Sequence, residues 1–301
     1  MELKTYLKKF FDIYEYDKKD AQILTDVYVK ITENEDTSKL FEQIMKMYEE
    51  DINCDYKQII EIADKIAEKL YIHEFTVELL VFICLSEKTE KVYAEKGIAP
   101  EVFYGNMCDL KYKLEECKLV YNITGSFVAQ WFERFFNATR FTFGRLQFEL
   151  IDFNKNYEKN GVVLTPESKV VNVHIPRSPL PFNEENCDKA FLMAAEFFKD
   201  EFEESIPFYC ASWLLYPENK EILSEKSNTY KFLSRFDIIK GRIDKTFHSL
   251  WRIFDTMEKH PDRLPEDTRI KKAYKEHLKR GGKIGSGEGL FFISKESLKK
   301  Q

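Results

Sequence analysis

Hydrophobic positions in the first 120 residues recur at three- and four-residue intervals, with Glu and Lys between them. EDTSKLFEQIMKMYEEDI and DYKQIIEIADKIAEKLY both show this spacing, which is typical of amphipathic helices. HEFTVELLVFICL is apolar on more than one side, and therefore predicts a central, buried helix. Gly97 and Pro100 mark a break before EVFYGNMCDLKYKLEECKLVY, the last helical segment. The pattern predicts an all-α domain over residues 1–122.

The pattern changes after Gly125, where alternation begins to replace the helical spacing. FVAQWFERFF predicts a short amphipathic helix, and RFTFGRLQFEL at 140–150 alternates like one half-buried strand. Its predicted hairpin partner is 161–164, after a polar turn. KVVNVHI at 169–175 is a β-branched strand that ends in the loop PRSPLPF, whose prolines exclude regular structure.

The remaining segments alternate between helical and extended patterns. Asn183 is suited to cap a helix over EENCDKAFLMAAEFFKDEF, and a strand follows at 206–215. Pro217 suits the first turn of a further helix, which precedes a short strand at 236–240. Helices at about 244–258 and 266–279 and a strand at 290–293 complete the chain. This order predicts a mixed sheet flanked by helices over residues 123–301, and an α+β fold class.

Composition narrows the classes of partner. The chain has 301 residues and a net charge of -6, whereas a general nucleic-acid binder is more often basic. A local basic pocket for one phosphate ligand is still compatible with this charge. The longest apolar run, Leu79–Leu85, is far shorter than the roughly 20 residues that cross a bilayer. The sequence therefore predicts neither a nucleic-acid nor a membrane partner, and it does not indicate an oligomeric state.

The six cysteines are scattered, without a CxxC pair or a histidine at metal-ligand spacing. This usage is typical of reduced thiols in a cytoplasmic protein, and it predicts no metal site. The glycine-rich segment 281–289 matches neither the P-loop pattern nor GxGxxG. It follows a helix ending in Lys279-Arg280, so it predicts a helix C-cap and a turn. A flexible lid over a cleft is the alternative.

Five short motifs together suggest a family. They are VFYGNMCDL (102–110), FGRLQFEL (143–150), VHIP with a following PL (173–180), CASWLL (210–215) and SNTYKFLSRF (227–236). The predicted order of strands and helices after residue 140 resembles the GNAT (N-acetyltransferase) fold, and these motifs, by their order and separation, carry a closer resemblance. The chain is more closely similar to bacterial acyltransferase domain-containing proteins, in which an α-helical N-terminal domain precedes a GNAT-like domain. The resemblance implies transfer of an acyl group from acetyl-CoA or another acyl-CoA to an amine or hydroxyl acceptor, both small molecules.

The resemblance also implies where the donor binds. Two central parallel strands, 170–175 and 208–215, would splay apart to accept the pantetheine arm, and the pyrophosphate would bind at the turn 177–186. The implied acyl-CoA contacts are His174, Ile175, Arg177, Ser178, Asn183, Cys210, Ser212 and Asn228. This turn contains none of the glycines that GNAT enzymes commonly carry there. That departure favours the alternative function, a non-catalytic ligand-binding or interaction protein on the same fold.

Three residues are candidates for catalysis. The resemblance implies that Tyr230 protonates the departing thiolate, and packing of its helix against the sheet is the alternative role. His174 is a candidate base, because the unperturbed pKa of a histidine suits removal of a proton from an acceptor near neutral pH. Its alternative role is that of a polar residue at a strand end, bonding a loop carbonyl. Glu149 is the other candidate base, directly or through water.

The acceptor pocket is predicted on the strand that carries Glu149. Arg145, Gln147 and Glu149 alternate on one side of FGRLQFE, and a solvated strand face is the alternative. Trp213 completes the predicted acceptor contacts, with a place in the core as its alternative. Cys210 has no sequence-local base, so its thiol is expected to be buried and inert.

Overall fold

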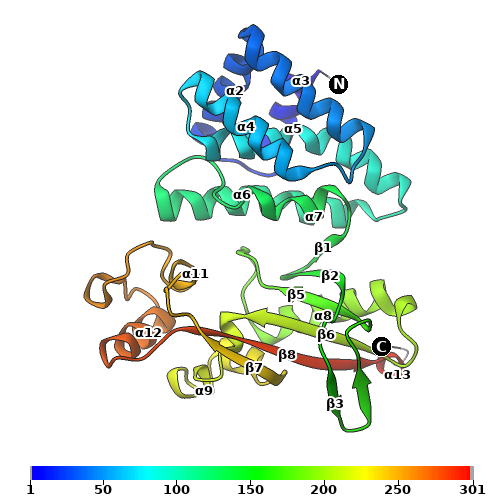
Figure 1. The fold of residues 1–301 in the computed structure, drawn as a ribbon, viewed down its shortest axis with the longest axis vertical. Helices are drawn as coiled ribbons and strands as arrows, with labels where there is room; N and C mark the ends of the chain where they lie inside the picture. The colour runs from blue at the N-terminus through cyan, green and yellow to red at the C-terminus, as the bar shows by residue number, and fades with distance from the viewer. Residues whose placement is uncertain (1, 299–301) are drawn as a thin grey trace. The chain divides into compact units, whose positions relative to one another are not determined.

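The computed structural model describes residues 2–298, and the chain forms two compact units, Met1–Phe141 (unit 1) and Thr142–Gln301 (unit 2). Unit 1 is helical, as the sequence predicts (Figure 1). Its elements are α1 (Leu3–Ile13), α2 (Lys18–Glu33), α3 (Glu35–Glu50), α4 (Tyr56–Leu70), α5 (Glu74–Glu95), α6 (Pro100–Tyr121), η1 (Ala129–Trp131) and α7 (Glu133–Phe136).

Helix α5 forms the centre of unit 1. Each residue from Leu79 to Leu85 has 0% exposure, which confirms the predicted buried helix. The following segment also packs in this unit, because the Tyr48 hydroxyl donates to the Phe136 carbonyl at 2.9 Å. The Tyr93 hydroxyl likewise donates to the Phe135 carbonyl at 2.8 Å. The first compact unit therefore extends to Phe141, whereas the domain boundary predicted from the sequence lies at residue 122.

Unit 2 alternates strands and helices, with β1 beginning at the unit boundary. The elements are β1 (Arg140–Phe143), β2 (Leu146–Asp152), β3 (Tyr157–Lys159), β4 (Val162–Leu164), β5 (Lys169–His174), α8 (Glu184–Phe198), η2 (Lys199–Glu201), β6 (Ser205–Ser212), η3 (Trp213–Leu215), α9 (Asn219–Ile222), α10 (Asn228–Leu233), β7 (Asp237–Ile243), α11 (Leu250–Phe254), η4 (Pro261–Arg263), α12 (Arg269–Lys279), β8 (Gly285–Ser294) and α13 (Lys295–Leu298).

The main sheet has the order β1-β2-β5-β6-β8-β7. Its β5–β6 pair is parallel, whereas β2–β5, β6–β8 and β7–β8 are antiparallel. Helix α8 covers one face, where the Phe191 ring contacts Phe148, Phe208 and Phe291 at centroid distances of 5.7, 5.2 and 4.7 Å. The mixed sheet and its helices confirm the predicted α+β fold class (Figure 1).

The predicted single strand at 140–150 is wrong, because the chain turns between β1 and β2. Gly144 has φ of +55°, a left-handed conformation that glycine adopts at little cost. The predicted pairing of this strand with 161–164 is also wrong. Residues 162–164 pair with β3 in a separate two-stranded hairpin, and β2 pairs with β5.

The turn predicted for the glycine-rich segment is only partly right. Gly281 has φ of +84° and forms the turn after α12, but Gly285, Gly287 and Gly289 lie within β8. A Cβ atom at Gly287 would meet the Leu215 carbonyl oxygen at 1.8 Å. The glycines therefore let β8 pass close to η3 and β7, and the segment is a central strand instead of a lid.

Two predicted helices are shorter than the pattern indicates. The segment after Pro217 divides into α9 and α10, and only Leu250–Phe254 is α-helical within 244–258. Residues of this region instead bury a cluster around α11 and α12, which includes Phe254, Tyr274 and Leu278. The local spacing was compatible with longer helices, but tertiary packing selects short ones joined by turns.

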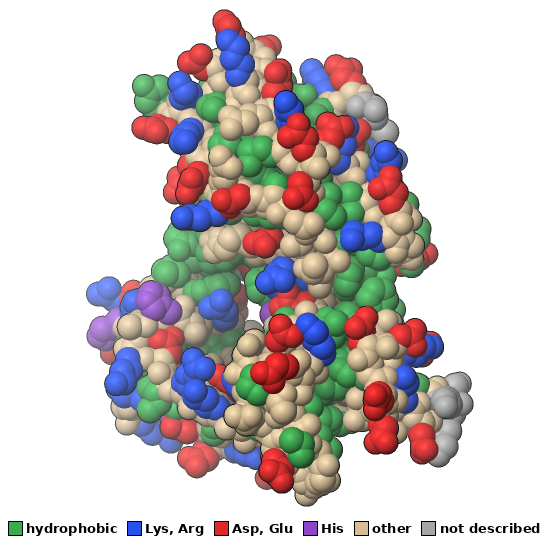
Figure 2. All heavy atoms as spheres, turned by 45° about the vertical axis from the view of Figure 1, so that its right-hand side comes forward, with side chains coloured by type: hydrophobic (Ala, Val, Ile, Leu, Met, Phe, Trp, Pro, Cys, Tyr) green, Lys and Arg blue, Asp and Glu red, His purple; other side chains and the backbone are tan. Residues whose placement is uncertain are grey.

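Acidic and basic side chains are interspersed over the exposed helical surface of unit 1 (Figure 2). Several form pairs four residues apart on one helix, such as Lys39 with Glu35 at 2.6 Å and Lys57 with Glu61 at 3.7 Å. Such exposed pairs each contribute little to stability. Within residues 2–298, none of the helices has both the length and the apolar content that spanning a bilayer requires.

Candidate active site

Strands β5 and β6 pair over only part of their length. The parallel register contains two pairs, Val171 with Phe208 and Asn172 with Tyr209. Beyond them β5 continues to His174 and β6 continues to Ser212. The two central strands therefore stop pairing while both are still extended, as the sequence resemblance implies. Main-chain groups beyond the last pair are positioned to bind a ligand along this opening.

A carboxylate and an imidazole meet beside this opening. The register between β2 and β5 places Glu149 opposite Asn172 and Gln147 opposite His174. His174 Nε2 lies 2.7 Å from Glu149 Oε1, and Asn172 Nδ2 donates to the same oxygen at 2.9 Å. The Glu149 residue is only 5% exposed, whereas the His174 side chain is 20% exposed. A buried carboxylate thus orients a more accessible imidazole.

The structure brings Gln147 to this group and places Arg145 differently. Gln147 is 1% exposed, and its Oε1 has no hydrogen-bond partner among residues 2–298. Arg145 lies in the turn between β1 and β2, so it does not share the strand face of Glu149. Its Nη1 donates to the Pro176 carbonyl at 2.6 Å, and burial lowers the pKa of its guanidinium. Arg145 therefore fixes the loop that follows β5.

The loop after β5 carries several predicted donor contacts. Ile175, Arg177 and Ser178 follow His174 directly, and all are half-buried. Arg177 Nη1 lies 3.7 Å from Asp255 Oδ1, and Ser178 Oγ accepts from the Leu180 amide at 3.2 Å. The loop leads to the N-terminus of α8. The positive end of the helix dipole and the main-chain amides of the first turn favour the binding of anions there.

The first turn of α8 is capped and its acids are paired. Asn183 Oδ1 accepts from the Asn186 amide at 2.9 Å. Glu184 pairs with Lys231, and Glu185 pairs with Lys189 at 2.7 Å. These lysines offset the negative charge that the sequence places at this end of the helix.

The predicted contacts on β6 and after it differ in accessibility. Cys210 is fully buried, and burial raises the pKa of its thiol, so it is not a nucleophile. Ser212 Oγ accepts from the Leu214 amide at 3.2 Å, which caps η3. Trp213 packs edge-on against Tyr274 at a centroid distance of 5.9 Å, in the cluster around α12.

Tyr230 and Asn228 lie in the short helix α10, whose N-cap is Ser227. The buried residues of α10 are Thr229, Phe232 and Leu233, whereas Tyr230 is half-buried and Asn228 is exposed. The residues before α10, up to Ile222, form a separate helix, α9. Tyr230 is therefore not a core residue of α10.

A second polar group on the sheet was missed by sequence reasoning. Lys155 Nζ donates to the Tyr209 hydroxyl at 3.1 Å and lies 3.4 Å from Glu288 Oε2, and Arg242 also pairs with Glu288. Burial raises the pKa of Glu288, but a hydrogen bond from Tyr209 and the charges of Lys155 and Arg242 hold it below its ordinary value. Since Tyr209 forms the last pair with Asn172, this group adjoins the Glu149–His174 pair. The alternating pattern of β6 could have placed Tyr209 on this face of the sheet. Glu288 could not be placed, because the glycine-rich segment that contains it was predicted to be a turn.

Among the described residues, no cluster of His, Cys, Asp and Glu side chains has an arrangement that would hold a metal ion.

Comparison with known proteins identifies both halves of the chain. Residues 5–138 match the N-acyltransferase N-terminal domain, and residues 141–291 match the GNAT-like C-terminal domain. No curated protein matches the sequence significantly.

Solved structures with the same fold are acyltransferases. One, in complex with decanoyl-CoA and teicoplanin, has a TM-score of 0.70 and 18% identity, over 95% of this chain and 87% of that chain. A mutant acyltransferase in complex with octanoyl-CoA has a TM-score of 0.71 and 18% identity, over 94% and 86% of the two chains. At this identity the likeness shows a shared fold.

Proposed function

The chain belongs to the N-acyltransferase family defined by these two domains, and from this premise we propose that it transfers an acyl group from acyl-CoA to an amine or hydroxyl acceptor. The single observation that carries the proposal is the position of the Glu149–His174 pair beside the opening between β5 and β6. A thioester held along that opening would present its carbonyl next to a base.

The hydrogen bond to Glu149 assigns the roles of the two imidazole nitrogens. A carboxylate only accepts, so Nε2–H of His174 donates at 2.7 Å and Nδ1 becomes the nitrogen that takes a proton. The charge of Glu149 also stabilises the imidazolium that forms. Glu149 thereby acts as a positioning residue and His174 as the base.

The bond changes are those of direct acyl transfer. The acceptor nitrogen or oxygen attacks the thioester carbonyl while His174 removes its proton, and the C–S bond then breaks. The thiolate of CoA leaves and takes a proton from Tyr230 or from water. Main-chain N–H groups of the splayed strands would stabilise the oxyanion.

Two observations support acyl-CoA as the donor. The acids at the start of α8 are paired with lysines, so their charge repels a pyrophosphate less. The related structures contain decanoyl-CoA, octanoyl-CoA or CoA. The 177–186 turn has no glycine that would let a phosphate approach its backbone closely. The pyrophosphate would therefore contact the main-chain amides at the N-terminus of α8, together with the Arg177 side chain. Teicoplanin, which is present in a related acyltransferase structure, is the first acceptor to test. The cytoplasmic location stays a prediction.

The test combines donor binding with turnover. Acetyl-, octanoyl- and decanoyl-CoA are added to the full chain, and thermal unfolding is measured together with release of the CoA thiol in the presence of teicoplanin or simple primary amines. A donor at 100 times its dissociation constant should add roughly 2.7 kcal/mol to stability.

His174→Ala should lower turnover by about 10²–10⁴-fold and leave the donor-induced shift in place. The matched control is His260→Ala, because the His260 side chain is 63% exposed and has no predicted role. If none of the acyl-CoAs stabilises the chain and no CoA is released, the non-catalytic alternative replaces this proposal.

A further inference from the structure

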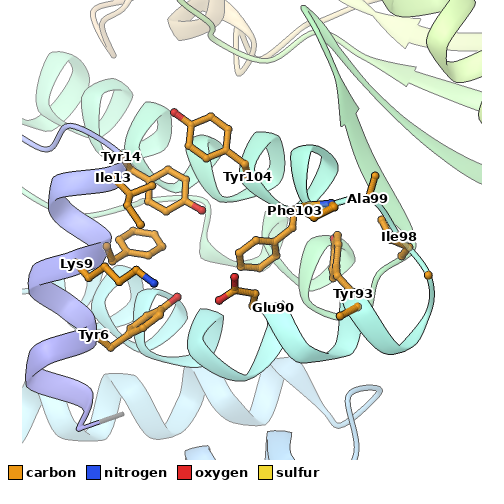
Figure 3. A pocket seen from close by; sticks show the side chains of 14 residues that line it. Tyr6, Lys9, Ile13, Tyr14, Glu90, Tyr93, Ile98, Ala99, Phe103 and Tyr104 are labelled. Carbon is orange, nitrogen blue, oxygen red and sulfur yellow. The ribbon is translucent and has the colours of Figure 1, made fainter.

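Unit 1 contains a pocket of about 600 Å³ between α1, α5 and α6 (Figure 3). This volume lies within the range of small-molecule sites in proteins. Its walls are mainly aromatic, and the rings come from Tyr6, Phe10, Tyr14, Tyr93, Phe103 and Tyr104. None of the residues proposed for acyl transfer lines it.

The aromatic walls are held by ring contacts that exist without a ligand. Tyr14 stacks on Tyr104 with 5.2 Å between ring centroids, and it also contacts Phe10 at 4.3 Å. On the opposite wall, Tyr93 and Phe103 meet edge to face at 5.4 Å. A flat ring entering the pocket would therefore meet preformed aromatic surfaces on two sides.

One tyrosine hydroxyl points into this pocket without a protein partner. Tyr14 is 7% exposed, and Figure 3 shows its hydroxyl turned toward the space beside Phe103. This hydroxyl has no hydrogen bond to any residue in the described part of the chain, whereas the nearby Tyr6 hydroxyl bonds Ser86 Oγ at 2.8 Å. Because this hydroxyl borders the open space of the pocket, a polar atom of a ligand can bond it in place of water.

Two opposite charges lie at the rim of the same pocket. Lys9 on α1 and Glu90 on α5 both turn toward it in Figure 3. Neither forms an ion pair or side-chain hydrogen bond with another residue between 2 and 298, although neighbours such as Lys91 and Glu95 are paired at 3.6 Å. A ligand with a single charge would satisfy only one of these two groups.

We propose that this pocket binds a free aromatic α-amino acid or a close zwitterionic analogue. The ammonium group pairs with Glu90, the carboxylate pairs with Lys9, and the ring packs between the aromatic walls. The Tyr14 hydroxyl bonds a polar atom of the ligand. This site goes beyond acyl transfer and does not depend on it, because binding is measured without a donor.

Isothermal titration calorimetry on the full chain tests the proposal with L-tryptophan as the probe. Tryptamine lacks the carboxylate and indole-3-propionate lacks the ammonium group, so each should bind at least about tenfold more weakly than tryptophan. Glu90→Gln should weaken tryptophan about tenfold and leave indole-3-propionate unchanged. Lys9→Met should weaken tryptophan similarly and leave tryptamine unchanged.

The control variants are Glu95→Gln and Lys8→Met, exposed neighbours on the same two helices that do not line the pocket. They should bind tryptophan like the unmodified chain. Because Lys9 and Glu90 are themselves exposed, their variants should fold normally, which circular dichroism checks. The proposal is overturned by the absence of saturable tryptophan binding, by equal or tighter binding of decanoate, or by affinities that do not change in the two rim variants.

Discussion

The Tyr230 hydroxyl is a suitable proton donor because of its setting in α10. The ring is half-buried, and its hydroxyl makes no hydrogen bond to residues in the described chain. A phenol and a thiol have ordinary pKa values close to one another, which favours proton transfer to a leaving thiolate. Tyr230→Phe should lower kcat about 10²-fold and leave the donor-induced thermal shift unchanged, as measured by CoA release and by unfolding.

Tyr71→Phe is the control for this substitution, since Tyr71 is 98% exposed and lies in unit 1. An unchanged kcat in Tyr230→Phe would assign the protonation of sulfur to water. In that case the Glu149–His174 pair would still account for the removal of the acceptor proton.

The sequence indicated which side chains could act in catalysis, but it did not indicate which of them contact one another. His174 and Glu149 were each predicted as candidate bases, but their contact depends on the register between β2 and β5. The sequence favoured a different partner for β2, so that register was not accessible. Arg145 shows the opposite case, in which alternation placed it beside Glu149 and a turn at Gly144 moved it away.

Strand β8 depends on a glycine that has no room for a side chain. A Cβ atom at Gly287 would lie 1.8 Å from the Leu215 carbonyl oxygen and 3.1 Å from the Leu215 Cβ atom. Gly287→Ala must push β8 away from η3, and overpacking of this kind typically costs about 1–3 kcal/mol. We expect the melting temperature of unit 2 to fall by several degrees in calorimetry.

The neighbouring Ser286→Ala supplies the matched control, because it lies on the same strand and already carries a Cβ atom. A Gly287→Ala variant as stable as Ser286→Ala would show that η3 can move away from β8 without cost.

Long periodic elements were the most predictable ones. Helices α3 to α6 follow apolar positions spaced over four or more turns, and their existence was read from the sequence. Short elements such as α9, α10 and α11 have too few residues to show a hydrophobic period. Packing in the cluster around Tyr274 determines where the helices of this region begin and end. The glycines of β8 looked like turn residues because the close approach that requires them is a long-range contact.

The molecule divides into two units with separate cores, so a change in one core acts first on the stability of that unit. In unit 1 the pKa of Glu78 is raised from 4.5 to about 8, mainly by burial and then by the charge and hydrogen bond of Asp64, with Glu74 adding to it. Between about pH 4.5 and pH 8, Glu78 therefore keeps its proton in the folded unit and loses it in the unfolded chain.

This difference predicts how the stability of unit 1 depends on pH. Because the folded pKa of Glu78 is raised, its contribution is most favourable below about pH 4.5 and declines as pH rises to about 8. Glu78→Gln removes the titration, so the variant should gain stability relative to the unmodified chain as pH increases from 5 to 9. Urea midpoints of the helical signal at each pH measure this, with Glu95→Gln as an exposed control. A midpoint difference that stays constant across this range would mean that Glu78 is already ionised in the folded unit, and that water or a cation compensates its charge.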